Sequence, residues 1–144
     1  MAYLKVMRPE DILKPTAAGL CSQIGGFHID PVRPVERALI THGHSDHARA
    51  GHGAVLATQE TLDMMRLRYG ENFAGSTQAI RYGETLKLGK AQVSFHPAGH
   101  VLGSAQICAE PSTCPAGWND TCVPPSFNVS PWRIACVEPA KFSP

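Results

Sequence analysis

The chain has 144 residues, of which 43% are hydrophobic and 17% charged, and its formal net charge is +1 at pH 7. This composition excludes a disordered chain and allows one domain with a real core. The small net charge implies neither a nucleic-acid-coating surface nor an acidic tail, and it leaves a local basic patch open. No apolar run is long enough to cross a bilayer, and residues 1–14 lack the apolar core of a signal peptide. We therefore expect a cytoplasmic protein with no membrane partner.

Short apolar runs bounded by glycine or proline predict the strands of the fold. They lie at residues 19–21, 27–30, 36–41, 54–57, 85–88 and 91–96. The first two are expected to form a hairpin, because the segment between them ends in two glycines.

One helix is expected after the fourth of these strands. Thr58 can cap its N-terminus, Leu62, Met65 and Tyr69 form its buried stripe, and Gly70 ends it. Strands, a helix and further strands predict a layered α/β fold with sheets inside and helices outside.

The chain changes character near Cys108. All seven histidines lie before this point, whereas residues 109–144 are rich in proline and show neither helical nor strand periodicity. We therefore divide the chain into a domain of residues 1–108 and an irregular tail of residues 109–144. The five cysteines form no Cys-x-x-Cys pair and are odd in number, which indicates reduced thiols rather than disulfides or a zinc knuckle.

Residues 42–47 contain three histidines and one aspartate, directly after a buried strand. Imidazole and carboxylate are the ligands that zinc and similar divalent ions prefer. His42 and His44 are two residues apart, so in extended backbone their side chains leave on the same face and can hold one ion. Asp46 and His47 follow a turn and can point to a second ion, as in two-metal hydrolases. The alternative is a surface histidine cluster without a metal, which this spacing disfavours.

His100 is the best candidate for a third ligand of the first ion. It follows the strand at residues 91–96 just as the histidine run follows an earlier strand. His96 ranks well below it, and His28 and His52 have no spacing that indicates a ligand. Asp30 is open to two interpretations: it supports the site through hydrogen bonds, or it ends a strand in an Asp-Pro turn.

The His-x-His-x-Asp-His run at residues 42–47 resembles the metallo-β-lactamase superfamily. The segment at residues 97–105 is similar to the β-CASP nucleases of that superfamily. Together with residues 27–31 and 33–37, it looks most like the bacterial ligase-associated DNA exonucleases, which are also labelled mRNA 3′-end processing factors. The resemblance covers residues 13–107, which correspond to the N-terminal part of such a protein.

This resemblance implies the first half of an αββα sandwich and a two-ion active site. His42, His44 and His100 would hold one zinc ion. Asp46 and His47 would hold the second and act as catalytic residues, with manganese as an alternative metal. Each ion would help to activate water and to offset charge on the substrate.

The resemblance also implies an activity and partners. The chain would hydrolyse phosphodiester bonds as a DNA exonuclease or an RNA 3′-end processing nuclease, with nucleic acid as substrate and a DNA ligase as partner. Asp30 would be the aspartate of the family's first motif, which supports the site.

The chain departs from the family after His100. The family places a bridging aspartate and a further histidine beyond this motif, whereas here no histidine follows and the only later aspartate is Asp120. A truncation or frameshift would produce such a tail, so we expect an impaired enzyme that binds one ion or none. We also expect Val93 and Phe95 to be exposed on an uncovered sheet face. Two alternatives stay open: a thioester-type hydrolase of the same fold, and a non-catalytic metal-binding fragment.

Overall fold

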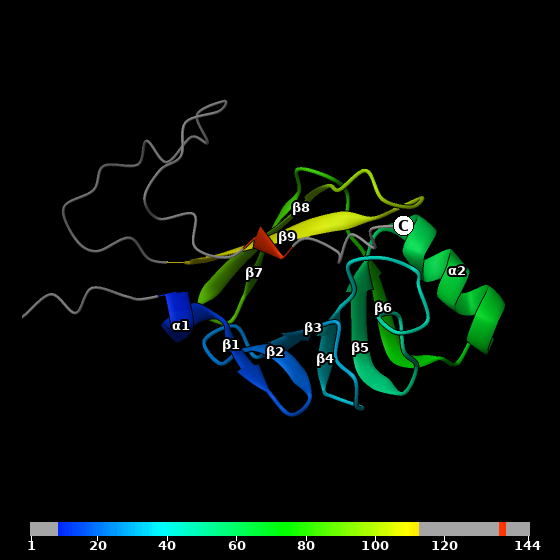
Figure 1. Ribbon diagram of the computed structural model, residues 1–144, viewed down its shortest axis with the longest axis horizontal. Helices are drawn as coiled ribbons and strands as arrows, with labels where there is room; N and C mark the ends of the chain where they lie inside the picture. Colours follow the sequence, from blue (N-terminus) through cyan, green and yellow to red (C-terminus); the bar gives the residue numbers. More distant parts are fainter. Residues whose placement is uncertain (1–8, 113–135, 138–144) are drawn as a thin grey trace, which may run out of the picture.

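A computed structural model describes residues 9–112 and 136–137, which form two β-sheets and two helices (Figure 1). The elements are α1 (Pro9–Ile12), β1 (Lys14–Thr16), β2 (Gly19–Ser22), β3 (Phe27–Ile29), β4 (Arg37–Leu39), β5 (His52–Ala57), α2 (Gln59–Tyr69), β6 (Ala74–Ala79), β7 (Thr85–Leu88), β8 (Ala91–Pro97), β9 (Ala105–Pro111) and β10 (Cys136–Val137). The first sheet has the order β1-β2-β3-β4-β5-β6 and the second the order β10-β9-β8-β7.

The first sheet changes from antiparallel to parallel pairing at β3. Strands β2 and β3 form the predicted hairpin, with Ser22 opposite Phe27, and β3, β4, β5 and β6 then run parallel. Because the carboxyl ends of parallel strands meet at one edge, residues that follow β3 and β4 emerge side by side. Asp30 follows β3, and its N–H donates to the carbonyl oxygen of Leu39 at the end of β4 (2.9 Å).

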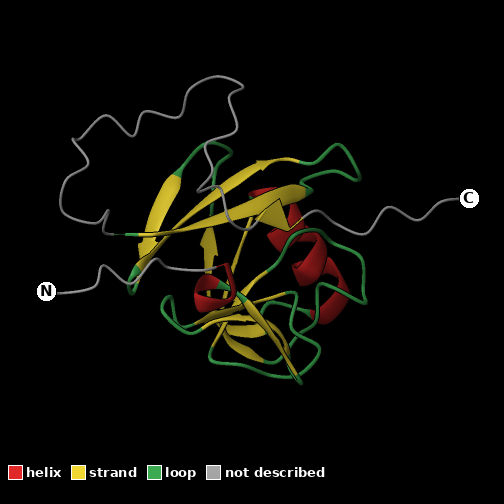
Figure 2. Ribbon diagram, turned by 60° about the vertical axis from the view of Figure 1, so that its left-hand side comes forward, coloured by secondary structure: helices red, strands yellow, loops and turns green. Residues whose placement is uncertain are grey.

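The main core lies between the two sheets, which Figure 2 shows as two groups of strands. Phe27 and Ile29 of the first sheet pack in one cluster with Val93, Phe95 and other residues of the second. Val93 is 1% exposed and Phe95 is 0% exposed, so the expectation that these side chains would be uncovered is wrong. The physical reason is strand alternation: their face of β8 is the one that docks on the first sheet.

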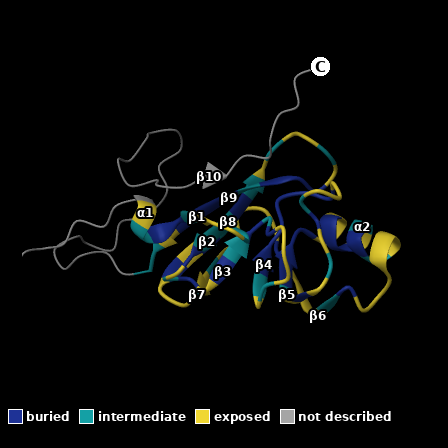
Figure 3. Ribbon diagram, turned by 60° about the horizontal axis from the view of Figure 1, so that its bottom comes forward, coloured by how far each residue is buried: buried dark blue, intermediate teal, exposed yellow. Residues whose placement is uncertain are grey.

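Helix α2 covers the opposite face of the first sheet. Leu62 and Met65 are buried against β4 and β5, and in Figure 3 these two strands are largely dark blue. The Thr58 side chain caps the helix by accepting from the N–H of Thr61, and Gly70 ends it with a φ of 84°, as predicted. Tyr69 is 38% exposed and is therefore not part of the buried stripe, which ends at Met65; Tyr69 is the last residue of the helix.

These elements confirm a layered α/β fold, with helix, sheet and sheet as three layers of the predicted sandwich. Within the described residues, neither helix is long and apolar enough to span a membrane. Strand β9 continues three residues past the boundary expected at Cys108, and β10 pairs with it. Cys21 and Cys108 carry free thiols. The rest of the tail, residues 113–135 and 138–144, lies outside the described residues, so its irregularity stays a prediction.

Candidate metal centre

The loop that follows β4 brings two histidine nitrogens to metal-binding distance. His42 is buried and His44 is exposed, and the Nε2 atom of His42 lies 3.2 Å from the Nδ1 atom of His44. A tetrahedral zinc ion with Zn–N distances of about 2.0–2.1 Å separates two ligand nitrogens by about 3.3 Å. The pair therefore fits a single ion without rearrangement.

His100 completes this group from the loop between β8 and β9. Its ring centroid lies 5.1 Å from those of both His42 and His44, and one ligand atom of each residue lies within 4.8 Å of the others. Since His44 and His100 are exposed, the group opens to solvent on one side. The structure thus brings together the three histidines expected to hold the first ion, in an arrangement with room for a fourth ligand such as water.

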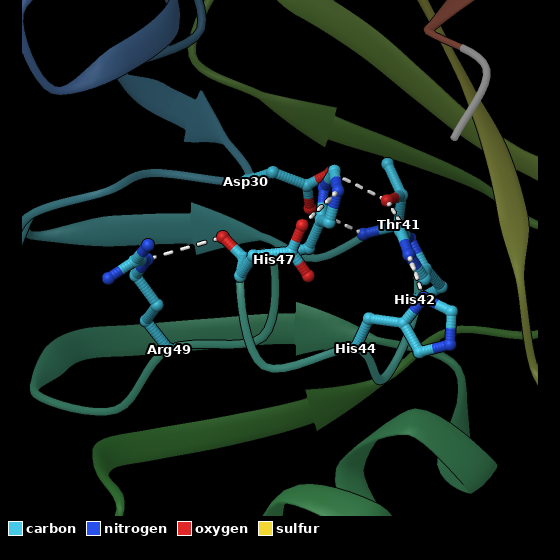
Figure 4. Close-up of polar contacts among 7 residues, drawn as sticks. Asp30, Thr41, His42, His44, His47 and Arg49 are labelled. Atoms are coloured by element: carbon cyan, nitrogen blue, oxygen red, sulfur yellow. Dashed lines mark hydrogen bonds and ion pairs between the residues drawn. The ribbon is translucent and has the colours of Figure 1, made fainter. Parts of the chain in front are cut away.

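Asp30 anchors the histidine loop through Thr41 and His47 (Figure 4). Its Oδ1 atom accepts from the backbone N–H of Thr41 (2.8 Å), and its Oδ2 atom accepts from the Thr41 hydroxyl (2.6 Å) and interacts with Nδ1 of His47 (2.9 Å). Asp30 has a φ of 44°, a left-handed conformation that non-glycine residues adopt only when their surroundings hold them there. The two sequence interpretations of Asp30 therefore coincide, because a turn at the end of β3 aims the carboxylate into the histidine loop.

The Asp30 carboxylate also sets the proton positions on two imidazoles. The Thr41 hydroxyl has one hydrogen and donates it to Asp30, so it accepts from Nδ1–H of His42, which lies 2.8 Å away. Nε2 of His42 is then left with a lone pair that faces His44. By the same reasoning, His47 donates Nδ1–H to Asp30 and keeps its Nε2 lone pair. Sequence reasoning missed this role of Thr41; its only signal was its place between the strand and the first histidine.

Burial and charge act in opposite directions on the two histidines. Burial, followed by the nearby His47 imidazole, lowers the pKa of His42 from 6.5 to about 4. His42 is therefore neutral at neutral pH, as a metal ligand must be. The hydrogen bond to Asp30 is the main cause that raises the pKa of His47, since it outweighs the opposing effect of burial.

A second group combines Asp30, His42 and His47, whose ligand atoms also lie within 4.8 Å of one another. Its carboxylate already takes part in three hydrogen bonds, so it fits a supporting role better than that of a ligand. Asp46, which we expected to hold the second ion with His47, places Oδ2 3.5 Å from Nε2 of His47 and has a 58% exposed side chain. That second ion site stays a prediction.

Two arginines hold backbone carbonyls of the histidine loop, and sequence reasoning did not assign either contact. Nη2 of Arg68, on α2, donates to the oxygen of Gly43 (2.9 Å). Nε of Arg49 donates to the oxygen of Asp46 (3.2 Å), and Figure 4 shows its side chain extending away from the histidines.

The remaining histidines lie outside both groups. Nε2 of His96 lies 2.9 Å from the hydroxyl oxygen of Ser94 on the same strand. His52 is buried and its Nδ1 atom accepts from the N–H of Val35 (3.3 Å). His28 lies on β3 and is partly buried.

Comparisons with known proteins give partial likenesses. No family model matches the chain. A protein of Opitutus terrae named "Probable DNA ligase" is 35% identical over 77 residues, which cover 53% of this chain and 7% of that protein. This chain thus matches only a small part of the length of that relative.

Among solved structures, a metallo-β-lactamase from Cronobacter sakazakii is 15% identical with a TM-score of 0.48, covering 69% of this chain and 52% of the other. The flavodiiron protein from Giardia intestinalis is 18% identical with a TM-score of 0.42, covering 51% and 20%. The diiron β-hydroxylase CmlA from Streptomyces venezuelae is 22% identical with a TM-score of 0.36, covering 56% and 19%. Since each of these TM-scores lies below 0.5, these likenesses do not assign the chain to a family.

Proposed function

We propose that this chain carries the metal centre of a metallo-β-lactamase-type phosphodiester hydrolase that acts on DNA or RNA. The observation that carries the proposal is the convergence of His42, His44 and His100 on one point that is open to solvent. Three neutral imidazoles with one open position are the ligand set of catalytic zinc, and we propose zinc with manganese as the alternative. When bound, the ion would make a water molecule more acidic and offset the charge that develops on the phosphate.

The chain's own residues divide the remaining work. His42 is held neutral by burial and fixed in its tautomer through Thr41, so it is ready to ligate without losing a proton. His47 is oriented by Asp30, which leaves its Nε2 atom directed toward Asp46. We propose that His47 and Asp46 act on the reacting water. We also propose that they bind a second ion more weakly than the three histidines bind the first, because Asp46 is the more exposed and less constrained partner.

A nucleic-acid substrate is favoured by two sequence observations. The segment at residues 97–105 resembles the β-CASP nucleases, and the similar protein from Opitutus terrae is named as a DNA ligase. We propose that a ligase-linked DNA exonuclease or an RNA 3′-end processing nuclease is the role of the whole protein. No specific observation favours a thioester substrate.

The test is to incubate the purified chain with labelled single- and double-stranded DNA and RNA, with zinc or manganese added. Because we expect an impaired enzyme, any cleavage should be weak, should need the metal, should be stopped by EDTA and should be lost in His42→Ala. His96→Ala is the matched control, because His96 lies near the site in sequence but outside both histidine groups.

Three outcomes separate the alternatives. Metal-dependent cleavage of nucleic acid supports the proposal. Cleavage of a thioester without cleavage of nucleic acid would replace it with the small-molecule hydrolase. Tight metal binding with neither activity would leave a non-catalytic metal-binding chain, which is the result expected if the residues present here supply only the first half of the site.

A further inference from the structure

The loop that carries His100 is fixed to the first turn of α2 through a single peptide group. The carbonyl oxygen of Gly103 accepts from the hydroxyl of Thr58 (2.6 Å) and lies 3.3 Å from the hydroxyl oxygen of Thr61. Both threonines are at most 2% exposed, so a donor or acceptor left without a hydrogen bond at this position would lower the free energy of unfolding. The contact joins segments more than 40 residues apart in the chain.

Gly103 is suited to this contact in both conformation and size. Its φ is 74°, in the left-handed region. A Cβ atom at this position would lie 2.7 Å from Oγ1 of Thr58, 2.8 Å from Cβ of Glu60 and 3.1 Å from the backbone nitrogen of Thr61. Two of these neighbours belong to the helix framework rather than to the end of a flexible side chain. Any larger residue must therefore push the loop away from α2.

The next residue passes this restraint on to His100. Ser104 is buried, and its hydroxyl oxygen accepts from the backbone N–H groups of His100 (3.1 Å) and Val101 (3.2 Å). The Ser104 carbonyl oxygen accepts from the hydroxyl of Tyr82 (2.8 Å). A displacement of Gly103 would thus move Ser104 and, through it, the backbone of His100.

We infer that Thr58 and Gly103 are positioning residues for the metal centre: the first turn of α2 sets where His100 meets His42 and His44. This inference rests on the proposed metal centre and adds a requirement that the three ligands alone do not impose. The hydroxyl of Thr58 has two functions, since it caps α2 by accepting from Thr61 N–H and holds the His100 loop by donating to Gly103. Changes at residue 58 or 103 should therefore alter metal binding although neither residue touches the ion.

The experiment titrates the chelator-treated chain with cobalt(II), whose visible absorption reports the number and geometry of its ligands. We expect Gly103→Ala to lower cobalt affinity on the order of 10–100-fold, the usual effect of residues that orient metal ligands, and to change the spectrum. Gly99→Ala is the matched control. Gly99 lies in the same loop, beside His100, with a φ of 68°, but an added Cβ would meet nothing within 4 Å. The Gly99→Ala variant therefore has the same cost of placing alanine in a left-handed conformation but no steric contact with α2.

A second pair of variants tests the Thr58 hydroxyl directly and does not depend on Gly103→Ala folding. Thr58→Val removes the hydroxyl and should reproduce the loss of affinity and the altered spectrum, whereas Thr58→Ser keeps the hydroxyl and should restore both. Circular dichroism shows whether each variant is folded.

Wild-type affinity and spectrum in both Gly103→Ala and Thr58→Val, or an equal loss in Gly99→Ala, would overturn the positioning role while leaving the metal centre intact. If the wild-type chain binds no cobalt, or if His100→Ala binds it as tightly, the metal centre itself is wrong and the positioning role falls with it.

Discussion

The two metal-ligand groups share His42 but differ in what their other atoms already bond to. In the group of His42, His44 and His100, the facing nitrogens have no carboxylate among them and open to solvent. In the group of Asp30, His42 and His47, the carboxylate takes part in three hydrogen bonds within the chain. We call His42, His44 and His100 the open group, because they are arranged to take an ion from outside. We call Asp30, His42 and His47 the closed group, because they are arranged to hold the open group in place.

The difference shows how a site can be rigid and open at once. Three histidine rings face one another at short distance, and burial, followed by the neighbouring His47 imidazole, keeps His42 neutral down to about pH 4. That arrangement is stable because the Asp30 charge, on the buried side, orders the loop through Thr41 and His47.

The largest effect is expected from removing a ligand of the open group. His44→Ala deletes one of three protein ligands, so its metal affinity should fall by more than the roughly 100-fold that the loss of an orienting residue costs at most. The measurement is metal content after dialysis against limiting zinc. His96→Ala should keep its metal, and equal metal content in His44→Ala and the wild type would refute the assignment.

Acid should destabilise the metal-free chain through the shared histidine. The folded pKa of His42 is about 4 against 6.5 unfolded, so below pH 6.5 the unfolded chain takes up a proton that the folded chain does not. The free energy of unfolding should therefore fall as pH drops from 6.5 toward 4, with about 3 kcal/mol at stake for His42. His52, whose pKa burial also lowers, acts in the same direction.

His47 should lower the free energy of unfolding on the high-pH side of this pH dependence. Its folded pKa is raised, so its contribution is fully present below pH 6.5 and is lost as pH rises through the folded value. Stability in EDTA should thus be greatest near pH 6.5. Chemical denaturation at several pH values measures this, and a profile that is no flatter in His42→Asn below pH 6.5 would contradict the assignment to His42.

Removing the Asp30 carboxylate from the closed group should weaken metal binding by the open group indirectly. Asp30→Asn replaces an acceptor-only carboxylate with an amide whose NH₂ would face the Thr41 hydroxyl or Nδ1 of His47, which already donate. We expect a loss of about 1–3 kcal/mol in unfolding free energy and an order of 10–100-fold in metal affinity. Unchanged affinity for cobalt or zinc in a folded Asp30→Asn would show that the two groups are independent.

The smallest effect is expected at Asp46. Its side chain is 58% exposed and places Oδ2 3.5 Å from Nε2 of His47, so Asp46→Asn should change the unfolding free energy by less than about 0.5 kcal/mol and leave the first ion bound. Isothermal titration with zinc should show the first binding step unchanged, because the second site, formed by Asp46 and His47 alone, is expected to be weak or empty. Loss of the first step would mean that Asp46 belongs to the open group.

Much of the fold could be predicted from the sequence because its signals are local. Apolar runs marked β2 to β5, β7 and β8, and Thr58 and Gly70 marked the ends of α2. Strand β6 was missed because Ala74–Ala79 is almost wholly exposed at the sheet edge and has no apolar alternation to read. The exposure of Val93 was misjudged because alternation separates the two faces of a strand but does not show which layer covers each face.

The candidate site divides in the same way. The histidine run could be read because its ligands are adjacent in sequence, and His100 because a strand delivers it. The contact between Thr58 and Gly103 could not be read, since it depends on how α2 and a distant loop pack. The bridging hydroxyl of Thr41 was hidden for a different reason, because a threonine at the end of a strand is common and its hydrogen bonds appear only in three dimensions.

One backbone contact has a consequence for how this molecule opens. The N–H of Ala105, at the start of β9, donates to the carbonyl oxygen of Thr41 (2.8 Å), so the second sheet is hydrogen-bonded to the loop that follows β4 of the first sheet, beside His42. An ion held by His42 and His100 would also join these two parts of the molecule. When the free ion concentration is 100 times the dissociation constant, binding to the native state alone adds about 2.7 kcal/mol to the free energy of unfolding. Amide hydrogen exchange at Ala105 should therefore slow when metal is added. This result would show that the bound ion opposes the opening of the junction between the two sheets.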